Sequence, residues 1–244
     1  MRDELDQNPQ PATLSFDAPV LLVGGASLDA EIFALAGAHA EAVVAADGGA
    51  NRFLPGEALE TEASRLTAVI GDMDSVSDLA HWRGRAGVEI HHLAEQDSTD
   101  LEKVLTRVDA PMLLGLGFLG ARFDHTLAAT HSLLRFSYRR VILIGEQDLI
   151  FLSPRRWRAR LPVGARVSVF PLRPGGAVAS RGLRWPLDGL RFETGLRIGT
   201  SNEAAAPEIA VEFEGRDAAV IWDRAHLGAA IEALAEADLS EAAP

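Results

Sequence analysis

Two acidic side chains end an apolar run at residues 66–70, in the order Gly71-Asp72-Met73-Asp74-Ser75. A short apolar run that breaks into Gly and Asp indicates a buried strand with the acids at its carboxyl end. Since side chains alternate along an extended strand, Asp72 and Asp74 are predicted to share one face. Two like charges held side by side are unfavourable unless a cation lies between them. The pair therefore predicts a metal site.

A second apolar run, residues 42–46, ends in Asp47 and is followed by Gly48-Gly49. The carboxyl ends of parallel strands meet at one edge of an α/β sheet, where such sheets bind ligands. Asp47 could therefore join the acidic pair. The alternative is that it only caps a short helix near residues 51–54.

The sequence Thr99-Asp100-Leu101-Glu102 fits a capping box, with Thr99 as the N-cap of a helix that carries apolar residues at helical spacing. Asp100 and Lys103 lie off the apolar stripe of that helix. They could form a surface ion pair. Alternatively, Asp100 extends the metal cluster and Lys103 binds a phosphate.

Two further strand-to-helix turns carry residues suited to phosphate binding. Gly24 and Gly25 follow the apolar residues 20–23, and such a turn lets backbone N–H groups approach a phosphate, although many glycine turns bind nothing. In Gly120-Ala121-Arg122-Phe123-Asp124-His125, Arg122 could clamp a phosphate while Asp124 accepts a substrate hydrogen bond or proton. The alternative there is a capping Asp beside a structural Arg.

These strand-to-helix turns indicate an α/β domain, with helices predicted near residues 28–37, 76–82 and 100–108 and a further helix that carries Leu127, Leu133 and Leu134. Residues 141–152 predict a β-hairpin. Beyond residue 153 the pattern changes to short strands separated by Pro and Gly, at 167–172, 177–187, 209–213 and 218–222, followed by a helix at 225–237. We therefore predict an α/β class with two domains, an α/β/α domain at 19–153 and an antiparallel β-sandwich domain at 154–244.

The composition is that of an ordinary globular chain of 244 residues, with 48% hydrophobic and 24% charged residues. A formal charge of −12 argues against a general nucleic-acid binder. The chain has no cysteine, no apolar run of the roughly 18 residues that span a membrane, and no signal-peptide pattern. We expect a cytoplasmic protein with neither nucleic-acid nor membrane partners.

Taken together, these motifs resemble the thiamine pyrophosphokinase family from about residue 20 to residue 222. The resemblance rests on six segments: 47–52 (DGGANR), 71–75 (GDMDS), 97–103 (DSTDLEK), 120–125 (GARFDH), 182–187 (GLRWPL) and 199–203 (GTSNE). It implies transfer of the β,γ-pyrophosphoryl group of ATP to the hydroxyethyl oxygen of thiamine, giving thiamine diphosphate and AMP. It also implies an N-terminal α/β domain with a mostly parallel sheet, a C-terminal β-sandwich, Mg²⁺ as cofactor and a homodimer with thiamine pockets between subunits.

The resemblance further implies roles for single residues. Mg²⁺ would be held by Asp72, Asp74 and Asp100, with Asp47 nearby. The catalytic residues would be these four acids together with Asp124. Contacts with ATP or its phosphates would come from Asn51, Arg52, Lys103 and Arg122, together with Gly24 and Gly25. Contacts with thiamine would come from Gln96, Asp124, Trp185, Thr200, Ser201 and Asn202.

The chain departs from the family pattern at two positions. Ala129 stands where the family commonly has Asn, and Glu95 stands where Asp is frequent. Trp185 could stack on thiamine or pack within the β domain, and Trp185 and Trp222 could be apolar contacts of a dimer. Alternative functions are a kinase or pyrophosphokinase for another small alcohol, such as a thiamine analogue or a pterin-like compound, or a non-catalytic thiamine- or nucleotide-binding relative.

Overall fold

In the computed structural model, residues 14–120 and 122–239 are described, and the chain divides into two compact units. We call Met1–Pro111 the first unit and Met112–Pro244 the second unit. Ala121 and the last five residues of the predicted second domain lie outside the described residues. The predicted domain boundary after residue 153 falls within the second unit.

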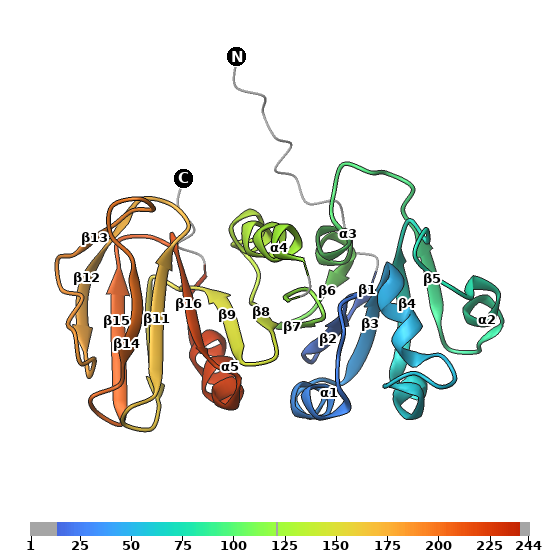
Figure 1. The fold of residues 1–244 in the computed structure, drawn as a ribbon, viewed down its shortest axis with the longest axis horizontal. Helices are drawn as coiled ribbons and strands as arrows, with labels where there is room; N and C mark the ends of the chain where they lie inside the picture. Colours follow the sequence, from blue (N-terminus) through green and yellow to red (C-terminus); the bar gives the residue numbers. More distant parts are fainter. Residues whose placement is uncertain (1–13, 121, 240–244) are drawn as a thin grey trace, which may run out of the picture. The chain divides into compact units, whose positions relative to one another are not determined.

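The first unit is built on four parallel strands in the order β2-β3-β4-β5 (Figure 1). The strands are β2 (Val20–Val23), β3 (Ala42–Ala46), β4 (Leu66–Gly71) and β5 (Glu89–His92). The connecting helices are α1 (Ala30–Gly37), η1 (Asp47–Phe53), η2 (Glu60–Arg65), α2 (Leu79–Gly84) and α3 (Asp100–Arg107). A separate parallel pair joins β1 (Leu14–Ser15) to β6 (Val108–Asp109).

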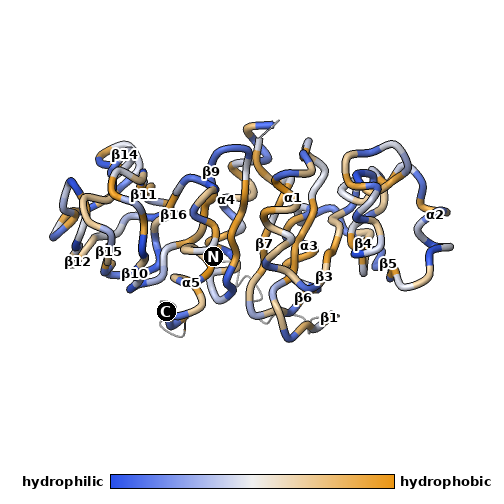
Figure 2. Tube along the Cα trace, turned by 90° about the horizontal axis from the view of Figure 1, so that it is seen from below, coloured by the Kyte–Doolittle hydropathy of each residue, from blue (hydrophilic) through white to orange (hydrophobic). Residues whose placement is uncertain are grey.

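Strands β2 and β3 are buried along their whole length, which fits the uninterrupted apolar runs that form them. Figure 2 shows orange, hydrophobic segments around the label of β3. Their register aligns Val23 with Ala45, and Ala46 with Ile70. Because the strands are parallel and in this register, the turns after β2, β3 and β4 meet at one edge of the sheet. The predicted parallel sheet with acids at its carboxyl edge is therefore confirmed for this unit.

The second unit contains a mixed sheet and a second, antiparallel sheet. In the mixed sheet, β7 (Leu113–Leu116) and β8 (Val141–Ile144) are parallel, and helix α4 (Phe123–Arg135) lies between them in sequence. The sheet continues with antiparallel strands, in the order β14-β11-β16-β9-β8. These strands are β9 (Asp148–Leu152), β11 (Arg166–Pro171), β14 (Gly199–Glu203) and β16 (Ala218–Asp223).

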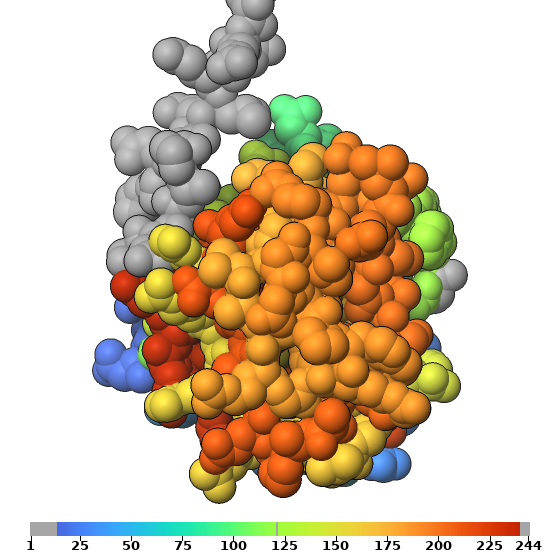
Figure 3. Space-filling model, turned by 90° about the vertical axis from the view of Figure 1, so that its left-hand side faces the viewer, coloured from blue at the N-terminus to red at the C-terminus, as the bar shows by residue number. Residues whose placement is uncertain are grey.

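The antiparallel sheet has the order β10-β15-β12-β13. Its strands are β10 (Arg156–Arg160), β12 (Gly175–Arg181), β13 (Arg191–Phe192) and β15 (Glu208–Phe213). The face drawn in Figure 3 is formed mainly by the orange segments of this unit. The chain then forms η3 (Arg224–His226) and α5 (Leu227–Ala235). The predicted hairpin is confirmed, because β8 and β9 pair antiparallel.

Two sequence predictions for these elements need correction, and one strand was not predicted. The strand that was not predicted is β10, in which Arg156, Arg158 and Arg160 alternate with the less exposed Trp157 and Ala159. The strand predicted at 177–187 is β12, which already ends at Arg181. The polar helix predicted at 76–82 is α2, which begins at Leu79 because the side chain of Asp78 caps it.

Trp222 lies in the core of the second unit. Its side chain has 0% exposure, and its ring meets those of Phe151 and Trp157 at centroid distances of 5.2 and 5.5 Å. The prediction that Trp222 is an apolar dimer contact is therefore wrong, since a fully buried ring has no surface to offer. Across residues 14–120 and 122–239, no helix is both long and apolar enough to cross a membrane.

Candidate active site

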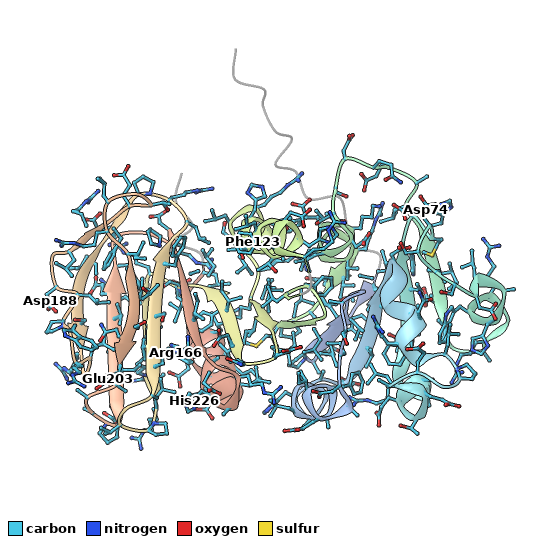
Figure 4. All side chains as sticks on the ribbon, in the orientation of Figure 1. Asp74, Phe123, Arg166, Asp188, Glu203 and His226 are labelled. Atoms are coloured by element: carbon cyan, nitrogen blue, oxygen red, sulfur yellow. The ribbon has the colours of Figure 1, made fainter. Side chains whose placement is uncertain are left out.

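The two acids after β4 lie in a turn. Strand β4 ends at Gly71, and Met73 has a φ of 67°, in the left-handed region. The backbone N–H of Asp74 donates to Asp72 Oδ1 over 3.2 Å. The prediction that strand alternation places both acids on one face is therefore wrong, because the extended conformation stops before Asp72. Figure 4 labels Asp74 at this carboxyl end of β4.

Asp72 is the centre of a bonded cluster. Lys103 Nζ lies 2.6 Å from Asp72 Oδ2, and Gln96 Nε2 donates to the same oxygen over 3.0 Å. The Lys103 and Asp72 side chains are 2% and 13% exposed. The prediction of a surface ion pair between Asp100 and Lys103 is wrong, because Lys103 is buried against Asp72. Lys103 and Gln96, which the sequence assigned to a phosphate and to thiamine, here hold a carboxylate.

The ion pair shifts both ionisable groups towards their charged forms. The hydrogen bond from Lys103 holds the pKa of Asp72 below its ordinary value, against the opposing effect of burial. Burial by itself lowers the pKa of Lys103. The hydrogen bond to Asp72 and the nearby charges of Asp72, Asp100 and Glu95 outweigh that effect, so this pKa is raised. Both groups are therefore charged at neutral pH.

Asp47 follows β3 directly and is 2% exposed, with a φ of 45°. Its Oδ2 accepts a hydrogen bond of 3.2 Å from the backbone N–H of Ser75, whereas its Oδ1 is buried without a hydrogen-bond partner. A side chain at Gly71 would clash with it, since a Cβ there would lie 2.6 Å from the Cβ of Asp47. The unpartnered carboxylate oxygen is a position that a cation or donor from a ligand would satisfy.

Helix η1, which begins at Asp47, ties two of the loops together. The side chain of Asn51 donates to the carbonyl of Ser75 and accepts from the N–H of Ser77, each over 2.8 Å. Arg52 donates to the carbonyl of Gly25 over 2.8 Å. Asn51 thus fixes the turn that carries Asp72 and Asp74, and Arg52 fixes the Gly24-Gly25 turn. These contacts could not be predicted from the sequence, because Asn51 and Arg52 lie far along the chain from their partners.

Helix α3 begins as predicted. Thr99 accepts from the N–H of Glu102, and the Glu102 side chain accepts from the N–H of Thr99, which completes the capping box. The loop before it is closed by Glu95, whose carboxylate accepts from the N–H groups of Asp97 and Ser98 and from the Ser98 hydroxyl. The hydroxyl bond is the main cause of a lowered pKa for Glu95. Glu95 therefore shapes this loop.

Within residues 14–120 and 122–239, no three or more His, Cys, Asp or Glu side chains are arranged to hold a metal ion. The acids nevertheless fit Mg²⁺ chemically, because the ion prefers oxygen ligands and one buried Asp47 oxygen has no partner. Mg²⁺ commonly takes only one or two carboxylates from a protein, with substrate phosphates completing its shell. The donor set fits an ion that is shared with a phosphate substrate.

In the second unit, Arg122 and Asp124 pair with each other at the start of α4. Arg122 Nε and a terminal nitrogen donate to the two Asp124 oxygens over 3.1 and 2.5 Å. Both side chains are about two-thirds exposed, at 65% and 64%, so this two-bond contact is open to a ligand. The bond from Arg122 is the main cause of a lowered pKa for Asp124. Phe123, labelled in Figure 4, is also exposed.

The other predicted residues of this unit surround Asn202. Its amide nitrogen donates to the carbonyl of Trp185 over 2.7 Å, and its oxygen accepts from the N–H groups of Trp185 and Glu203. Trp185 is 52% exposed, with the Arg184 guanidinium 5.0 Å from its ring centroid. The alternative that Trp185 packs in the core is therefore wrong. Thr200 and Ser201 are exposed, and Ser201 has a φ of 62°.

The structure thus joins Asp72, Gln96 and Lys103 in one bonded group in the first unit, and it joins Trp185 to Asn202 in the second. A hollow of about 570 Å³ also occurs in the second unit, lined by residues of β10, β12, β15 and α5. None of the predicted site residues lines that hollow. It does not correspond to the predicted chemistry.

A buried acid–lysine cluster at the carboxyl edge of a parallel sheet defines an α/β protein suited to phosphate chemistry. Two family models match the chain: "Thiamin pyrophosphokinase, catalytic domain" over residues 33–144, and "Thiamin pyrophosphokinase, vitamin B1 binding domain" over residues 159–217. Thiamine pyrophosphokinase 1 of Oryza sativa subsp. japonica is 31% identical over 205 residues, covering 73% of this chain and 76% of the relative. The chain belongs to the thiamine pyrophosphokinase family, as the sequence motifs predicted.

A further relative and two solved structures are also thiamine pyrophosphokinases. Thiamin pyrophosphokinase 1 of Caenorhabditis elegans is 29% identical over 183 residues, covering 68% of this chain and 72% of the relative. The crystal structure of yeast thiamin pyrophosphokinase matches with a TM-score of 0.70 at 18% identity, over 91% of this chain and 95% of that one. The enzyme from Geobacillus thermodenitrificans matches with a TM-score of 0.68 at 21% identity, over 84% and 97%. The mixed α/β fold is therefore that of these proteins.

Proposed function

We propose that this protein transfers the pyrophosphoryl group of ATP to thiamine, giving thiamine diphosphate and AMP. The observation that carries the proposal is the buried Lys103–Asp72 ion pair with its Gln96 contact, in a chain that belongs to the thiamine pyrophosphokinase family. Asp72 stands at the ligand-binding edge of the sheet, and Lys103 brings a positive charge to the same point. An acid and a cation at one edge suit a magnesium-bound polyphosphate.

In this reaction the hydroxyethyl oxygen of thiamine forms a bond to the β-phosphorus of ATP. The bond between that phosphorus and the bridging oxygen to the α-phosphorus breaks, and AMP leaves with the oxygen. The proton of the hydroxyl group passes to a carboxylate or to water, with Asp124 our candidate acceptor. Such transfers depend on neutralised charge and in-line positioning.

Mg²⁺, when bound with ATP, supplies charge neutralisation on the phosphates. We assign its protein oxygens to Asp72, Asp74 and Asp100, with Asp47 beside them. Lys103, Arg122 and Arg52 contribute positive charge towards the phosphates, and the Gly24-Gly25 turn offers backbone N–H groups. Asn51 acts by holding the acidic turn through its two bonds to Ser75 and Ser77.

For thiamine, we assign recognition to Gln96 and Asp124, together with Trp185, Thr200, Ser201 and Asn202. The half-exposed Trp185 ring is available for stacking, and Asn202 fixes the backbone on both sides of it. We also propose the predicted domains, an α/β domain for ATP at 19–153 and a β-sandwich domain for thiamine at 154–244, with Gln96 and Asp124 as thiamine contacts from the α/β domain. We further propose a cytoplasmic homodimer, with Trp185 and not Trp222 as an apolar contact.

The test is an assay of the full chain with ATP, MgCl₂ and thiamine, in which AMP and ADP are separated by chromatography. AMP formed in equal amount with thiamine diphosphate supports the proposal, and EDTA should abolish both products. ADP formation indicates a simple kinase. AMP formation only with another alcohol from a panel would identify a different substrate, and no turnover with any alcohol would indicate a binding protein.

A further inference from the structure

The ammonium of Lys103 lies against Asp72, one of the acids that we assign to Mg²⁺. The ammonium nitrogen lies 2.6 Å from Asp72 Oδ2, and the Lys103 side chain is 2% exposed. A charge this well shielded from water is stable only when it is paired and hydrogen-bonded. The ammonium therefore neutralises Asp72.

The position of this ammonium is set by rigid elements. Lys103 belongs to the first turns of α3, whose start is fixed by the reciprocal bonds of Thr99 and Glu102. Asp72 is held by the N–H of Asp74 and by Gln96 as well as by Lys103. An ionised carboxylate offers about four lone-pair positions, so three donors leave little room for a cation.

We propose that Lys103 is a place-holding cation: it keeps Asp72 neutralised in the free protein, so that a divalent ion enters only together with a polyphosphate. This inference rests on the proposed function. When metal and polyphosphate arrive together, the phosphates give the Lys103 ammonium a new negative partner. Asp72 is then released to the metal ion.

One observation and one physical argument support this order of entry. No three His, Cys, Asp or Glu side chains in residues 14–120 and 122–239 are arranged as a ready-made metal site. A divalent ion at Asp72 would also lie against the Lys103 ammonium, and like charges at such a distance repel. The free chain therefore binds divalent ions weakly. Lys103 is a positioning residue that keeps divalent ions away from Asp72 until a polyphosphate binds.

The first experiment measures Mn²⁺ binding to the full chain without nucleotide or thiamine, using the electron paramagnetic resonance signal of free Mn²⁺. Wild type should bind weakly. Lys103→Met, which keeps the length of the side chain without its charge, should bind about 10-fold more tightly or better, an effect comparable to known outer-shell changes of metal affinity. Lys103→Gln, which retains a donor but no charge, should change affinity in the same direction.

Two controls separate this effect from a general loss of positive charge. Arg83→Met removes one exposed cation from α2 and should leave Mn²⁺ affinity unchanged. The double variant Asp72→Asn with Lys103→Met should lose the gain, because the freed carboxylate is no longer present. A gain that persists in the double variant would overturn the assignment to Asp72.

A second measurement uses only the wild-type chain, so the proposal remains open to test even if both Lys103 variants fail to fold. Mn²⁺ binding is repeated with α,β-methylene-ATP, in which the bond that breaks in the proposed reaction is blocked. Tight binding by the chain, measured against a protein-free mixture of Mn²⁺ and the analogue, should appear only when the analogue is present. Tight Mn²⁺ binding by the free wild type, or unchanged affinity in a folded Lys103→Met, would overturn the proposal. No readout requires thiamine or turnover, so an incorrect substrate assignment would not produce these outcomes.

Discussion

The side-chain amide of Asn51 spans the turn that carries the acids, donating to the carbonyl of Ser75 and accepting from the N–H of Ser77, each over 2.8 Å. Asn51→Ala removes both bonds and leaves the turn free to shift. We expect kcat/KM to fall about 10- to 100-fold, since misplacement by about 1 Å can cost that much. Stability should fall by only about 1–2 kcal/mol, because net hydrogen-bond contributions are small.

Ser77→Ala is the matched control for Asn51→Ala. The backbone N–H of Ser77 donates to the Asn51 side chain, so loss of the Ser77 hydroxyl leaves this hydrogen bond in place. Its kcat/KM and its urea midpoint should match those of wild type. If Asn51→Ala were as active as Ser77→Ala, the amide would not position the acids.

The Lys103–Asp72 pair predicts how stability depends on pH. The folded pKa of Asp72 lies below its ordinary value of 3.8, so its contribution is present above that value and is lost as pH falls through the folded pKa. The folded pKa of Lys103 lies above 10.5, so its contribution is complete below 10.5 and is lost as pH rises through the folded pKa. The pair therefore stabilises across the whole neutral range.

Asp72→Asn should reduce the free energy of unfolding by about 3 kcal/mol at neutral pH, because it leaves a buried ammonium without its anion. The difference from wild type should shrink as pH falls from 3.8 through the lower folded pKa of Asp72, where the wild-type carboxylate becomes protonated. Urea titrations at several pH values measure this. Asp74→Asn removes an acid from the same turn without touching Lys103, and a similar loss in that variant would contradict the prediction.

Two glycines near the same edge should differ in their tolerance of alanine. A Cβ at Gly49 would lie 2.0 Å from the carbonyl oxygen of Val23, whereas a Cβ at Gly25 meets nothing within 4 Å. Gly49→Ala should therefore destabilise by about 3 kcal/mol or prevent folding, since backbone cannot yield as a side chain does. Gly25→Ala should keep the wild-type melting temperature within a few degrees, and equal losses in both would contradict the packing argument.

Local patterns in the sequence predicted much of this structure. The apolar runs at 42–46 and 66–70 identified β3 and β4, and the capping box identified the start of α3 at Asp100. Each of these signals involves residues close together in the chain. The alternation of arginines with Trp157 and Ala159 was also a usable signal for β10, but the positive charge obscured it.

Contacts between distant residues could not be predicted in the same way. Lys103 and Asp72 are 31 positions apart, and nothing in the order of residues specifies which acid the lysine meets. The turn at Met73 requires a positive φ that Met seldom adopts, so the strand was expected to continue. Asn51 resembled a ligand contact by its motif, whereas the folded chain uses its amide to hold Ser75 and Ser77.

Asn202 should affect thiamine more than ATP. Its buried amide satisfies both backbone groups of Trp185, so Asn202→Ala leaves these groups unpaired at a cost of about 1–3 kcal/mol each. We expect a lower melting temperature and a raised KM for thiamine. The KM for ATP should change by less than about twofold, because no ATP contact is removed. Trp185→Ala, which retains the backbone contacts, should raise KM for thiamine with little loss of stability.

Ser201→Ala provides a comparison, since the exposed Ser201 contacts Ser168 only through its backbone N–H. It should leave stability unchanged and raise KM for thiamine if its hydroxyl contacts the substrate. Equal changes in the KM of thiamine and ATP for Asn202→Ala would contradict the assignment of thiamine binding to this region.

The proposed homodimer predicts that two inactive variants can restore one another. Asp72→Asn disables the acids of the first unit, and the Ser201→Ala/Asn202→Ala double variant disables the thiamine contacts of the second. If each pocket draws these parts from different chains, a heterodimer contains one intact pocket and one doubly defective pocket. A random mixture should then regain up to about a quarter of wild-type activity. Mass measurement at the assay concentration must give a dimer, with labelled subunits proving exchange. A monomer, or proven exchange without recovered activity, would show that each chain carries a complete site.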